Sequence, residues 1–188
     1  MKGKKQKGNK KNKKEDSDNE NNSSNNNSDD NSENEEEINV KYLKGKYFIF
    51  AKENKKKVVT IPKSSKSPGT QLEIDNFTKG GSKQFEIEPL DNGMYAIKSC
   101  ISGLYLKIKE GFKTDEVVQD EYDENSDVFK WIFEVKEENQ KGVYIKSAFG
   151  GVDSEDFYMI VEGYEPKSHA KIIIGPFDES QKFLLCRK

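Results

Sequence analysis

An aromatic strand motif occurs three times along the chain, and this repeat constrains the fold more than any other feature. Its copies read KQFEIEPL, FKWIFEV and QKFLLCR. Their central aromatic residues, Phe85, Trp131 and Phe183, are separated by 46 and 52 residues. A period of about fifty residues indicates one supersecondary unit that is used three times.

The segments between these motifs have the pattern of short β-strands. Runs rich in Val, Ile, Tyr and Phe alternate with charged residues and Gly-containing turns, and no stretch keeps a helical period for three turns. Twelve runs qualify as strands: KYFIFAK, KVVTI, TQLEI, QFEIEPL, MYAIKS, LYLKIK, EVVQDEY, WIFEV, VYIKS, FYMIV, KIIIG and KFLLC. They fall into groups of four that begin at Tyr47, Tyr95 and Tyr144. The expected repeats are residues 41–90, 91–136 and 137–188.

Three such units have a physical reason to associate. One four-stranded unit cannot bury its apolar face alone, whereas three can close around a common axis and remove most exposed strand edges. A domain of this length buries roughly 70% of its chain surface, which is enough for a core. The sequence therefore predicts an all-β domain over residues 39–188, with the three aromatic strands in equivalent positions.

The first 38 residues have a different composition. Residues 1–37 contain ten asparagines, five serines and no aromatic residue, and Met1 is their one apolar residue. Residues 1–14 carry eight lysines and no acid, and residues 15–37 carry ten acids and no base. Such a segment buries too little apolar surface to offset its ordering entropy, so we expect a disordered low-complexity tail.

Charge and hydropathy exclude several classes of protein. Outside the tail the basic and acidic side chains balance, so nucleic acid is not an expected partner. The lysine run leads into no apolar segment, and no run approaches the ~20 apolar residues of a membrane helix. We therefore expect a cytoplasmic protein without a membrane span, with unconventional export or nuclear entry left open. Cys100 and Cys186 fit reduced thiols better than a disulfide framework.

The aromatic strands and their surroundings resemble the ricin-type (R-type) lectin family of β-trefoils. Its Q-x-W signature is similar to QKF at Gln181–Phe183, where Phe replaces Trp, and to FKW, which keeps Trp131. ISGLYLKI resembles the family segment S-G-x-x-L, and Gln119 lies 12 residues before Trp131 as in the family pattern. The resemblance covers residues 41–188 and implies a β-trefoil.

The resemblance also implies galactose or N-acetylgalactosamine binding in shallow pockets, up to one per repeat. The family pocket uses an Asp after the second-strand Leu, an aromatic platform, and Asn or Gln donors near Q-x-W. Thr60, Lys107 and Ile160 occupy the Asp position here. Any sugar site in this chain must therefore be built from other residues.

Two segments offer a polar side chain beside an aromatic ring, the combination that suits sugar hydroxyls and an apolar sugar face. In repeat two the candidates are Gln119, Tyr122, Asn125 and Asp127. In repeat three they are Asp153, Asp156, His169, Phe177, Asp178 and Gln181, of which Gln181 matches the family motif. The alternatives are a solvated acidic loop with Tyr122 as a packing anchor, and a hairpin that uses Phe177 and Gln181 structurally.

Enzyme and metal sites find little support. His169 is the only histidine, so a zinc site would lack its usual ligands, and its neighbourhood carries no nucleophile motif. The stretch DENSD at 123–127 is similar to the start of a calcium loop, but Val128 stands where that loop needs Gly. We expect no enzyme activity, metal or cofactor.

The leading expectation is a small lectin that binds glycans or glycoproteins, with a homodimer or several sites supplying avidity. The alternative is an intracellular protein-interaction trefoil, fascin-like and cytoskeletal, without a sugar site.

Overall fold

The computed structural model of the protein describes residues 40–109, 115–136, 142–150 and 156–187. The predicted tail and the candidate Asp153 lie outside these residues. Regular structure in the described part consists of strands and short 3-10 turns. The strands are β1 (Gly45–Ala51), β2 (Lys57–Thr60), β3 (Thr70–Gln71), β4 (Glu73–Asn76), β5 (Gln84–Pro89), β6 (Tyr95–Ser99), β7 (Tyr105–Ile108), β8 (Val117–Asp120), β9 (Trp131–Glu134), β10 (Tyr144–Ser147), β11 (Tyr158–Val161), β12 (Ile172–Gly175) and β13 (Phe183–Arg187). The turns are η1 (Val40–Tyr42), η2 (Pro62–Ser64), η3 (Gly81–Lys83), η4 (Asp91–Gly93), η5 (Asp127–Phe129) and η6 (Glu162–Tyr164).

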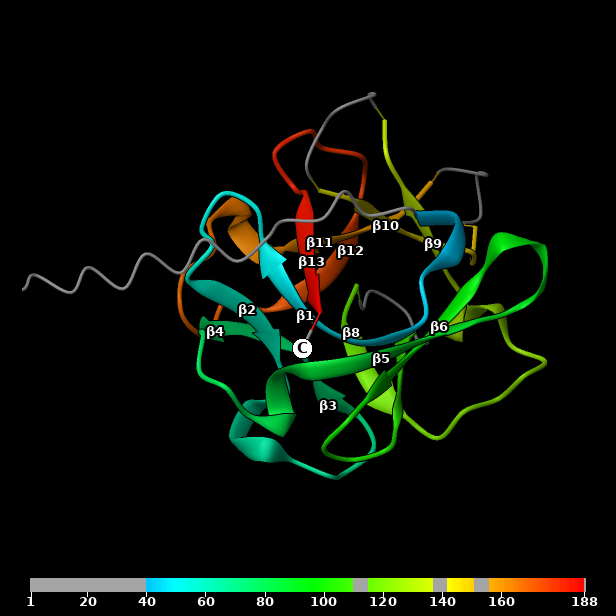
Figure 1. Cartoon of the computed structure of the whole chain (residues 1–188), viewed down its shortest axis with the longest axis horizontal. Helices are drawn as coiled ribbons and strands as arrows, with labels where there is room; N and C mark the ends of the chain where they lie inside the picture. Colours follow the sequence, from blue (N-terminus) through cyan, green and yellow to red (C-terminus); the bar gives the residue numbers. More distant parts are fainter. Residues whose placement is uncertain (1–39, 110–114, 137–141, 151–155, 188) are drawn as a thin grey trace, which may run out of the picture. The chain divides into compact units, whose positions relative to one another are not determined.

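Six strands form a closed barrel (Figure 1). β1 pairs with β5 and β13, β6 pairs with β5 and β9, and β10 pairs with β9, all antiparallel. A bridge between Val143 and Phe183 joins the start of β10 to β13 and completes the ring. Closure satisfies strand edges that would otherwise pair with other chains.

Six of the seven remaining strands form three hairpins, β2–β4, β7–β8 and β11–β12. The hairpins contact one another through β3 with β8, and through the bridges Glu73–Lys171 and Glu116–Ile173. The run TQLEI was expected as one strand, but Thr70 and Gln71 pair with β8 whereas Glu73 onward pairs with β2. The described chain therefore has thirteen strands instead of twelve, in the predicted all-β, β-trefoil arrangement.

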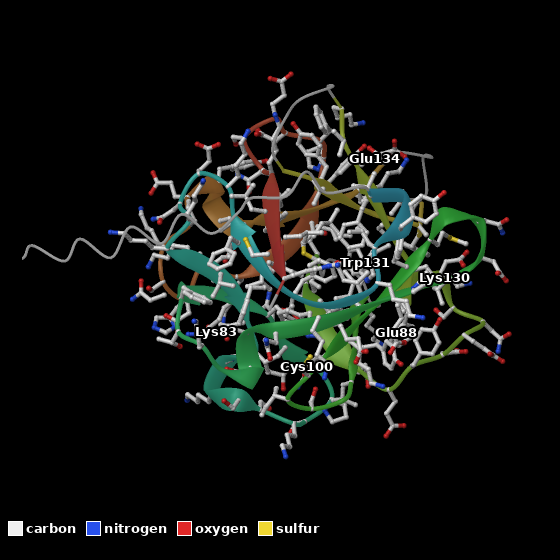
Figure 2. All side chains as sticks on the ribbon, viewed as in Figure 1. Lys83, Glu88, Cys100, Lys130, Trp131 and Glu134 are labelled. Atoms are coloured by element: carbon white, nitrogen blue, oxygen red, sulfur yellow. The ribbon has the colours of Figure 1, made fainter. Side chains whose placement is uncertain are left out.

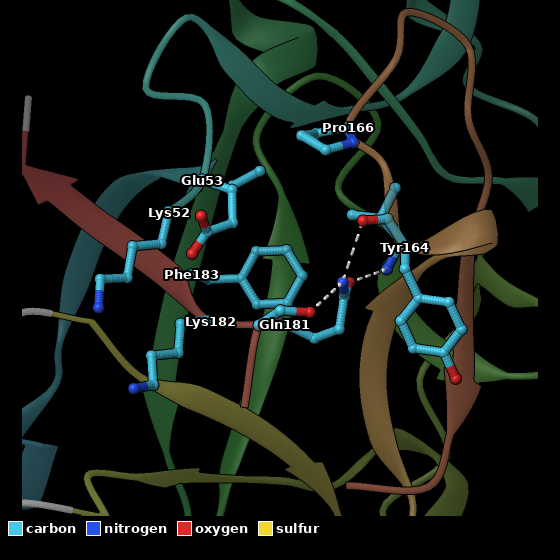
Figure 3. A pocket seen from close by; sticks show the side chains of 10 residues that line it. Lys52, Glu53, Tyr164, Pro166, Gln181, Lys182 and Phe183 are labelled. Carbon is cyan, nitrogen blue, oxygen red and sulfur yellow. Dashed lines mark hydrogen bonds between the residues drawn. The ribbon is translucent and has the colours of Figure 1, made fainter. Parts of the chain in front are cut away.

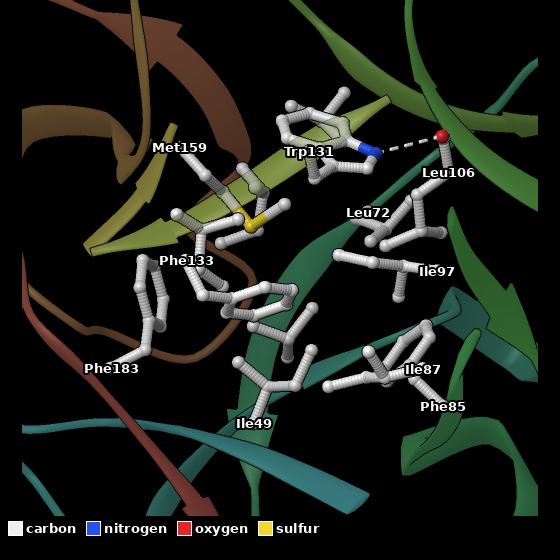
Figure 4. Close-up of a cluster of buried hydrophobic side chains, with 14 of the residues drawn as sticks. Ile49, Leu72, Phe85, Ile87, Ile97, Leu106, Trp131, Phe133, Met159 and Phe183 are labelled. Atoms are coloured by element: carbon white, nitrogen blue, oxygen red, sulfur yellow. Dashed lines mark hydrogen bonds between the residues drawn. The ribbon is translucent and has the colours of Figure 1, made fainter. Parts of the chain in front are cut away.

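The three motif aromatics occupy equivalent positions, as the repeat predicts. Each lies between a residue of its own repeat's first strand and a residue of the next repeat's first strand. These neighbours are Tyr47 and Ser99 for Phe85, Tyr95 and Ser147 for Trp131, and Val143 and Ala51 for Phe183. All three rings are buried in the common core (Figure 4). The Trp131 indole also donates a hydrogen bond to the Leu106 carbonyl at 3.1 Å.

The predicted correspondence of Tyr144 with Tyr47 and Tyr95 is wrong. In each repeat, one residue of the first strand pairs with the second strand: Phe50, Lys98 and Lys146. These three residues correspond, and so do the isoleucines that precede them. Val143 is therefore the equivalent of Tyr47 and Tyr95. Tyr144 belongs to a separate apolar cluster outside the main core.

Strand β5 illustrates how the sequence sets the two faces of the barrel wall. Phe85 and Ile87 are fully buried, whereas the alternate Glu86 and Glu88 are partly exposed. Asn92 and Gly93 follow with φ of 59° and 75°, which is the backbone of a tight hairpin turn into β6. Glu88 is thereby held on the outside of the barrel beside β6.

Candidate functional site

A glutamate, a lysine and a tyrosine from three different strands meet on the outer face of repeat two. The Tyr105 hydroxyl on β7 donates to Glu88 Oε2 on β5 at 2.9 Å. Lys98 Nζ on β6 lies 3.9 Å from Glu88 Oε1 and 5.1 Å from the Tyr105 ring centroid. We call this arrangement the Glu–Lys–Tyr set.

The same set occurs on the outer face of repeat three. The Tyr158 hydroxyl donates to Glu134 Oε2 at 3.0 Å, and Lys146 Nζ lies 3.8 Å from Glu134 Oε1. The positions correspond in register, because Lys98 pairs with Tyr105 and Lys146 pairs with Tyr158. Figure 2 shows Glu88 and Glu134 on either side of Trp131.

Each set lies against a further aromatic ring that follows the third strand of its repeat. Tyr122, two residues after β8, lies 4.6 Å from the Tyr105 ring between centroids. Phe177, two residues after β12, lies 5.3 Å from the Tyr158 ring and 4.9 Å from the Tyr144 ring. Phe177 is 43% exposed. The two aromatic residues chosen from the sequence thus occupy equivalent places beside equivalent polar groups.

Repeat one has apolar side chains at the corresponding positions. Cys186, Phe50 and Val58 replace the Glu, Lys and Tyr, and Phe77 replaces the following aromatic. They pack into one cluster with Phe48 and Leu184. The trefoil therefore folds at this position without the Glu–Lys–Tyr set, and the set in the other two repeats is not a requirement of the fold.

Burial and neighbouring groups raise the pKa values of the tyrosines and lysines of both sets. Burial, and then the hydrogen bond to Glu88, raises the pKa of the Tyr105 hydroxyl. Burial raises the pKa of Tyr158 as well. The neighbouring Tyr105 raises the pKa of Lys98. At neutral pH each face therefore presents a neutral hydroxyl donor beside an ammonium group.

Ion pairs balance the charge on both faces. In repeat two, Lys107 pairs with Asp120 at 3.1 Å and Lys130 pairs with Asp127 at 2.8 Å. In repeat three, Lys146 pairs with Asp156 at 2.7 Å and Lys136 with Glu134 at 2.9 Å. Each of these ammonium groups has a carboxylate partner, so neither face carries the excess positive charge that attracts an anion.

The two candidate glutamines are buried parts of the fold. Gln119 accepts a hydrogen bond from Ser102 Oγ at 2.7 Å and donates to the carbonyls of Ser65 and Ser67 at 3.0 and 3.1 Å. Gln181 Oε1 accepts from the buried Val161 amide at 2.9 Å. Their polar atoms hold neighbouring loops, which is the structural alternative considered for Gln181 from the sequence.

The other candidates are dispersed. Asp156 pairs with Lys146 and therefore lies on the repeat-three face, where the Phe177 ring contacts Tyr158. Asp127 pairs with Lys130 on the repeat-two face. Asp178 and Asn125 serve local turns, in which Asp178 accepts from Ser180 and Asn125 donates to Asp123. His169 lies away from Phe177, because its Nδ1 is 3.0 Å from Glu73 of repeat one.

Gln181 also borders a small hollow between repeats one and three (Figure 3). The hollow is lined by Ala51, Lys52, Glu53, Val161, Tyr164, Pro166, Ser180, Gln181, Lys182 and Phe183. It lies beside the core aromatic Phe183 and contains no Glu–Lys–Tyr set, so we assign it no ligand.

We expect the substitution Gln181→Ala to lower the free energy of unfolding by about 1–3 kcal/mol, because it leaves the buried Val161 amide without its acceptor. Urea denaturation followed by circular dichroism measures this directly. Unchanged stability would contradict the structural role of Gln181.

Sequence reasoning missed the Glu–Lys–Tyr set although the repeat contains a signal for it. Glu88 and Glu134 each lie three residues after a motif aromatic, and both lysines follow the isoleucine of an I-K-S tripeptide. Both tyrosines lie in the second strand of their repeats. Comparing the exposed positions of the repeats, and not only their buried ones, would have identified the set.

Metal binding and membrane crossing find no support in the described part of the chain. No group of three His, Cys, Asp or Glu side chains there is arranged to hold a metal ion. Nor does any helix among the described residues have the length and apolar character needed to cross a bilayer.

Comparison with known proteins agrees with the β-trefoil fold described above. The family model of ricin-type beta-trefoil lectin-like domains matches residues 37–118. No curated protein sequence matches the chain.

Similar solved structures are β-trefoils. The designed 3-fold symmetric protein ThreeFoil is 20% identical, with a TM-score of 0.64 over 77% of this chain and 99% of that one. The Macrolepiota procera ricin B-like lectin, solved in complex with lactose, is 16% identical, with a TM-score of 0.62 over 78% and 99%. The C-half of the earthworm R-type lectin, in complex with GalNAc, is 15% identical, with a TM-score of 0.55 over 75% and 97%. The protein is therefore a β-trefoil that resembles the ricin-type lectins.

Proposed function

We propose that the protein is a lectin that binds carbohydrate on the outer faces of repeats two and three. The observation that carries this proposal is the Glu–Lys–Tyr set, which occurs twice at equivalent positions beside an aromatic ring and is absent from repeat one. Carboxylate, ammonium and hydroxyl groups supply directional hydrogen bonds to sugar hydroxyls, and the ring supports the apolar sugar face.

Neutral saccharides suit these faces better than acidic ones. Carboxylate partners already pair with the ammonium groups of Lys98, Lys107, Lys130, Lys136 and Lys146. A charged sugar would have to break one of these pairs, whereas a neutral sugar can hydrogen-bond beside them. We therefore propose glycans that end in galactose or N-acetylgalactosamine, which the lactose and GalNAc complexes of structural neighbours support.

The role we propose is binding without catalysis. The polar groups of each set are engaged with one another in hydrogen bonds and ion pairs, an arrangement that suits recognition of sugar hydroxyls. A multivalent lectin of this kind gains avidity from its two faces, or from association of two chains.

A glycan array probed with the full-length protein tests the proposal. We expect signal on glycans with terminal galactose or N-acetylgalactosamine, and we expect free lactose to compete for it. An array without specific signal, together with co-sedimentation on cytoskeletal filaments, would reject the lectin and support the fascin-like alternative.

A further inference from the structure

The two candidate faces differ at the residue two positions after the glutamate of each set. In repeat three this residue is Lys136, just after β9. In repeat two the corresponding residue, two positions after Glu88, is Leu90. Repeat three therefore has an ammonium group at a place where repeat two has an apolar side chain.

The ammonium group of Lys136 lies over the rings that a sugar would stack on. Its Nζ is 4.9 Å from the Phe177 ring centroid and 5.4 Å from the Tyr158 ring centroid. These distances are typical of cation–π contacts. The Phe177 ring, although 43% exposed, is thus partly occupied by the chain itself.

Lys136 also occupies the polar groups of the set in repeat three. Its Nζ lies 2.9 Å from Glu134 Oε2 and donates to the Tyr158 hydroxyl at 3.1 Å. In repeat two the corresponding Glu88 is bound by the Tyr105 hydroxyl and, at 3.9 Å, by Lys98. The carboxylate, hydroxyl and ring in repeat three are therefore all engaged by one extra cation.

We propose that Lys136 is an internal competitor for the repeat-three site, so that repeat two binds glycan first and repeat three binds it more weakly. This inference rests on the proposed lectin function. It assigns to Lys136 a difference in affinity between the two faces that carry the Glu–Lys–Tyr set.

Lys136 keeps its positive charge at neutral and mildly basic pH. The hydrogen bond to Glu134, and then the one to Tyr158, raises the pKa of Lys136. Deprotonation at neutral or mildly basic pH therefore does not release the ring faces. The Lys136 side chain is 42% exposed, so a ligand can displace it at moderate cost.

Variants of the full-length protein in which one face has lost its aromatic ring allow the other face to be measured alone. Tyr122→Ala removes the aromatic ring of repeat two and leaves repeat three to be titrated with lactose by isothermal calorimetry. In this background, Lys136→Leu is expected to tighten lactose binding about fivefold to tenfold, the combined effect of one cation–π contact and one exposed ion pair. The reciprocal substitution Leu90→Lys, made in a Phe177→Ala background, is expected to weaken binding at repeat two.

Lys171→Leu is the matched control. It also removes one ammonium group from an ion pair, with Glu73, and its side chain is 39% exposed, but it lies in the contact between the β4 and β12 hairpins. This variant should leave the lactose affinity of repeat three unchanged.

The outcomes separate this inference from the function on which it rests. Unchanged binding after Lys136→Leu would overturn the inference. Weaker binding would overturn it too and would make Lys136 a ligand-binding donor. In both cases the lectin function would stand. If no variant and no wild-type protein bound lactose or any array glycan, both proposals would fail.

Discussion

Replacing Trp131 with alanine is expected to lower the free energy of unfolding by about 3–5 kcal/mol, the usual cost of truncating a buried aromatic side chain. Trp131 is fully buried and its indole donates to the Leu106 carbonyl. The substitution therefore opens a cavity where repeats two and three meet and leaves that carbonyl without its donor. Urea denaturation followed by far-UV circular dichroism measures the change, because this signal reports the backbone and does not need the tryptophan.

Two control variants make this result specific. Trp131→Phe should cost much less, because Phe85 and Phe183 occupy the equivalent positions in the other repeats. Phe177→Ala should also cost little, since its ring is substantially exposed. A loss of stability for Trp131→Ala no larger than that for Phe177→Ala would contradict the threefold core.

The paired substitution Glu88→Gln with Glu134→Gln is expected to weaken lactose binding about 10- to 100-fold, the usual effect of removing a charged hydrogen-bonding partner. Glutamine preserves the shape of each side chain but removes the carboxylate that orients the Tyr and Lys of its set. Calorimetric titration with lactose measures the loss, and urea denaturation of the same variant shows that it is folded.

Glu116→Gln serves as the control for that pair. Glu116 also pairs with a lysine, Lys109, at 2.6 Å, but it lies directly before β8 and outside both Glu–Lys–Tyr sets. Its substitution should leave lactose affinity intact. Equal losses for both variants would mean that general surface charge, and not the set, determines binding.

The fold was largely predictable because its strongest determinants are local and repeated. The three motif aromatics, their spacing and the alternation along segments such as FEIE specify buried and exposed faces directly. The prediction was wrong at Tyr144, where the strand register decides which residue faces the core. A shift of one residue moves a strand side chain to the opposite face, and the sequence VYIKS offers two apolar residues, Val143 and Tyr144, for one core position.

The candidate site was less predictable because it depends on contacts between strands that are distant in sequence. Tyr122 and Phe177 are the aromatic residues that the sequence offers as sugar platforms, and both lie beside polar groups. Those groups come from other strands and, for the glutamates, from the preceding repeat. Gln119 and Gln181 were chosen from the family pattern, and the structure uses both inside the fold. Polarity in a sequence does not distinguish a ligand-binding group from one that satisfies the backbone.

Nuclear magnetic resonance titration of the isotope-labelled full-length protein with lactose tests the central claim most directly. We predict that backbone amide shifts change first around Glu88, Tyr105 and Tyr122, and at higher lactose concentration around Tyr158 and Phe177. Amides in the apolar cluster of repeat one should not respond. Shift changes centred on that cluster, or on the contacts among the three hairpins, would contradict the account.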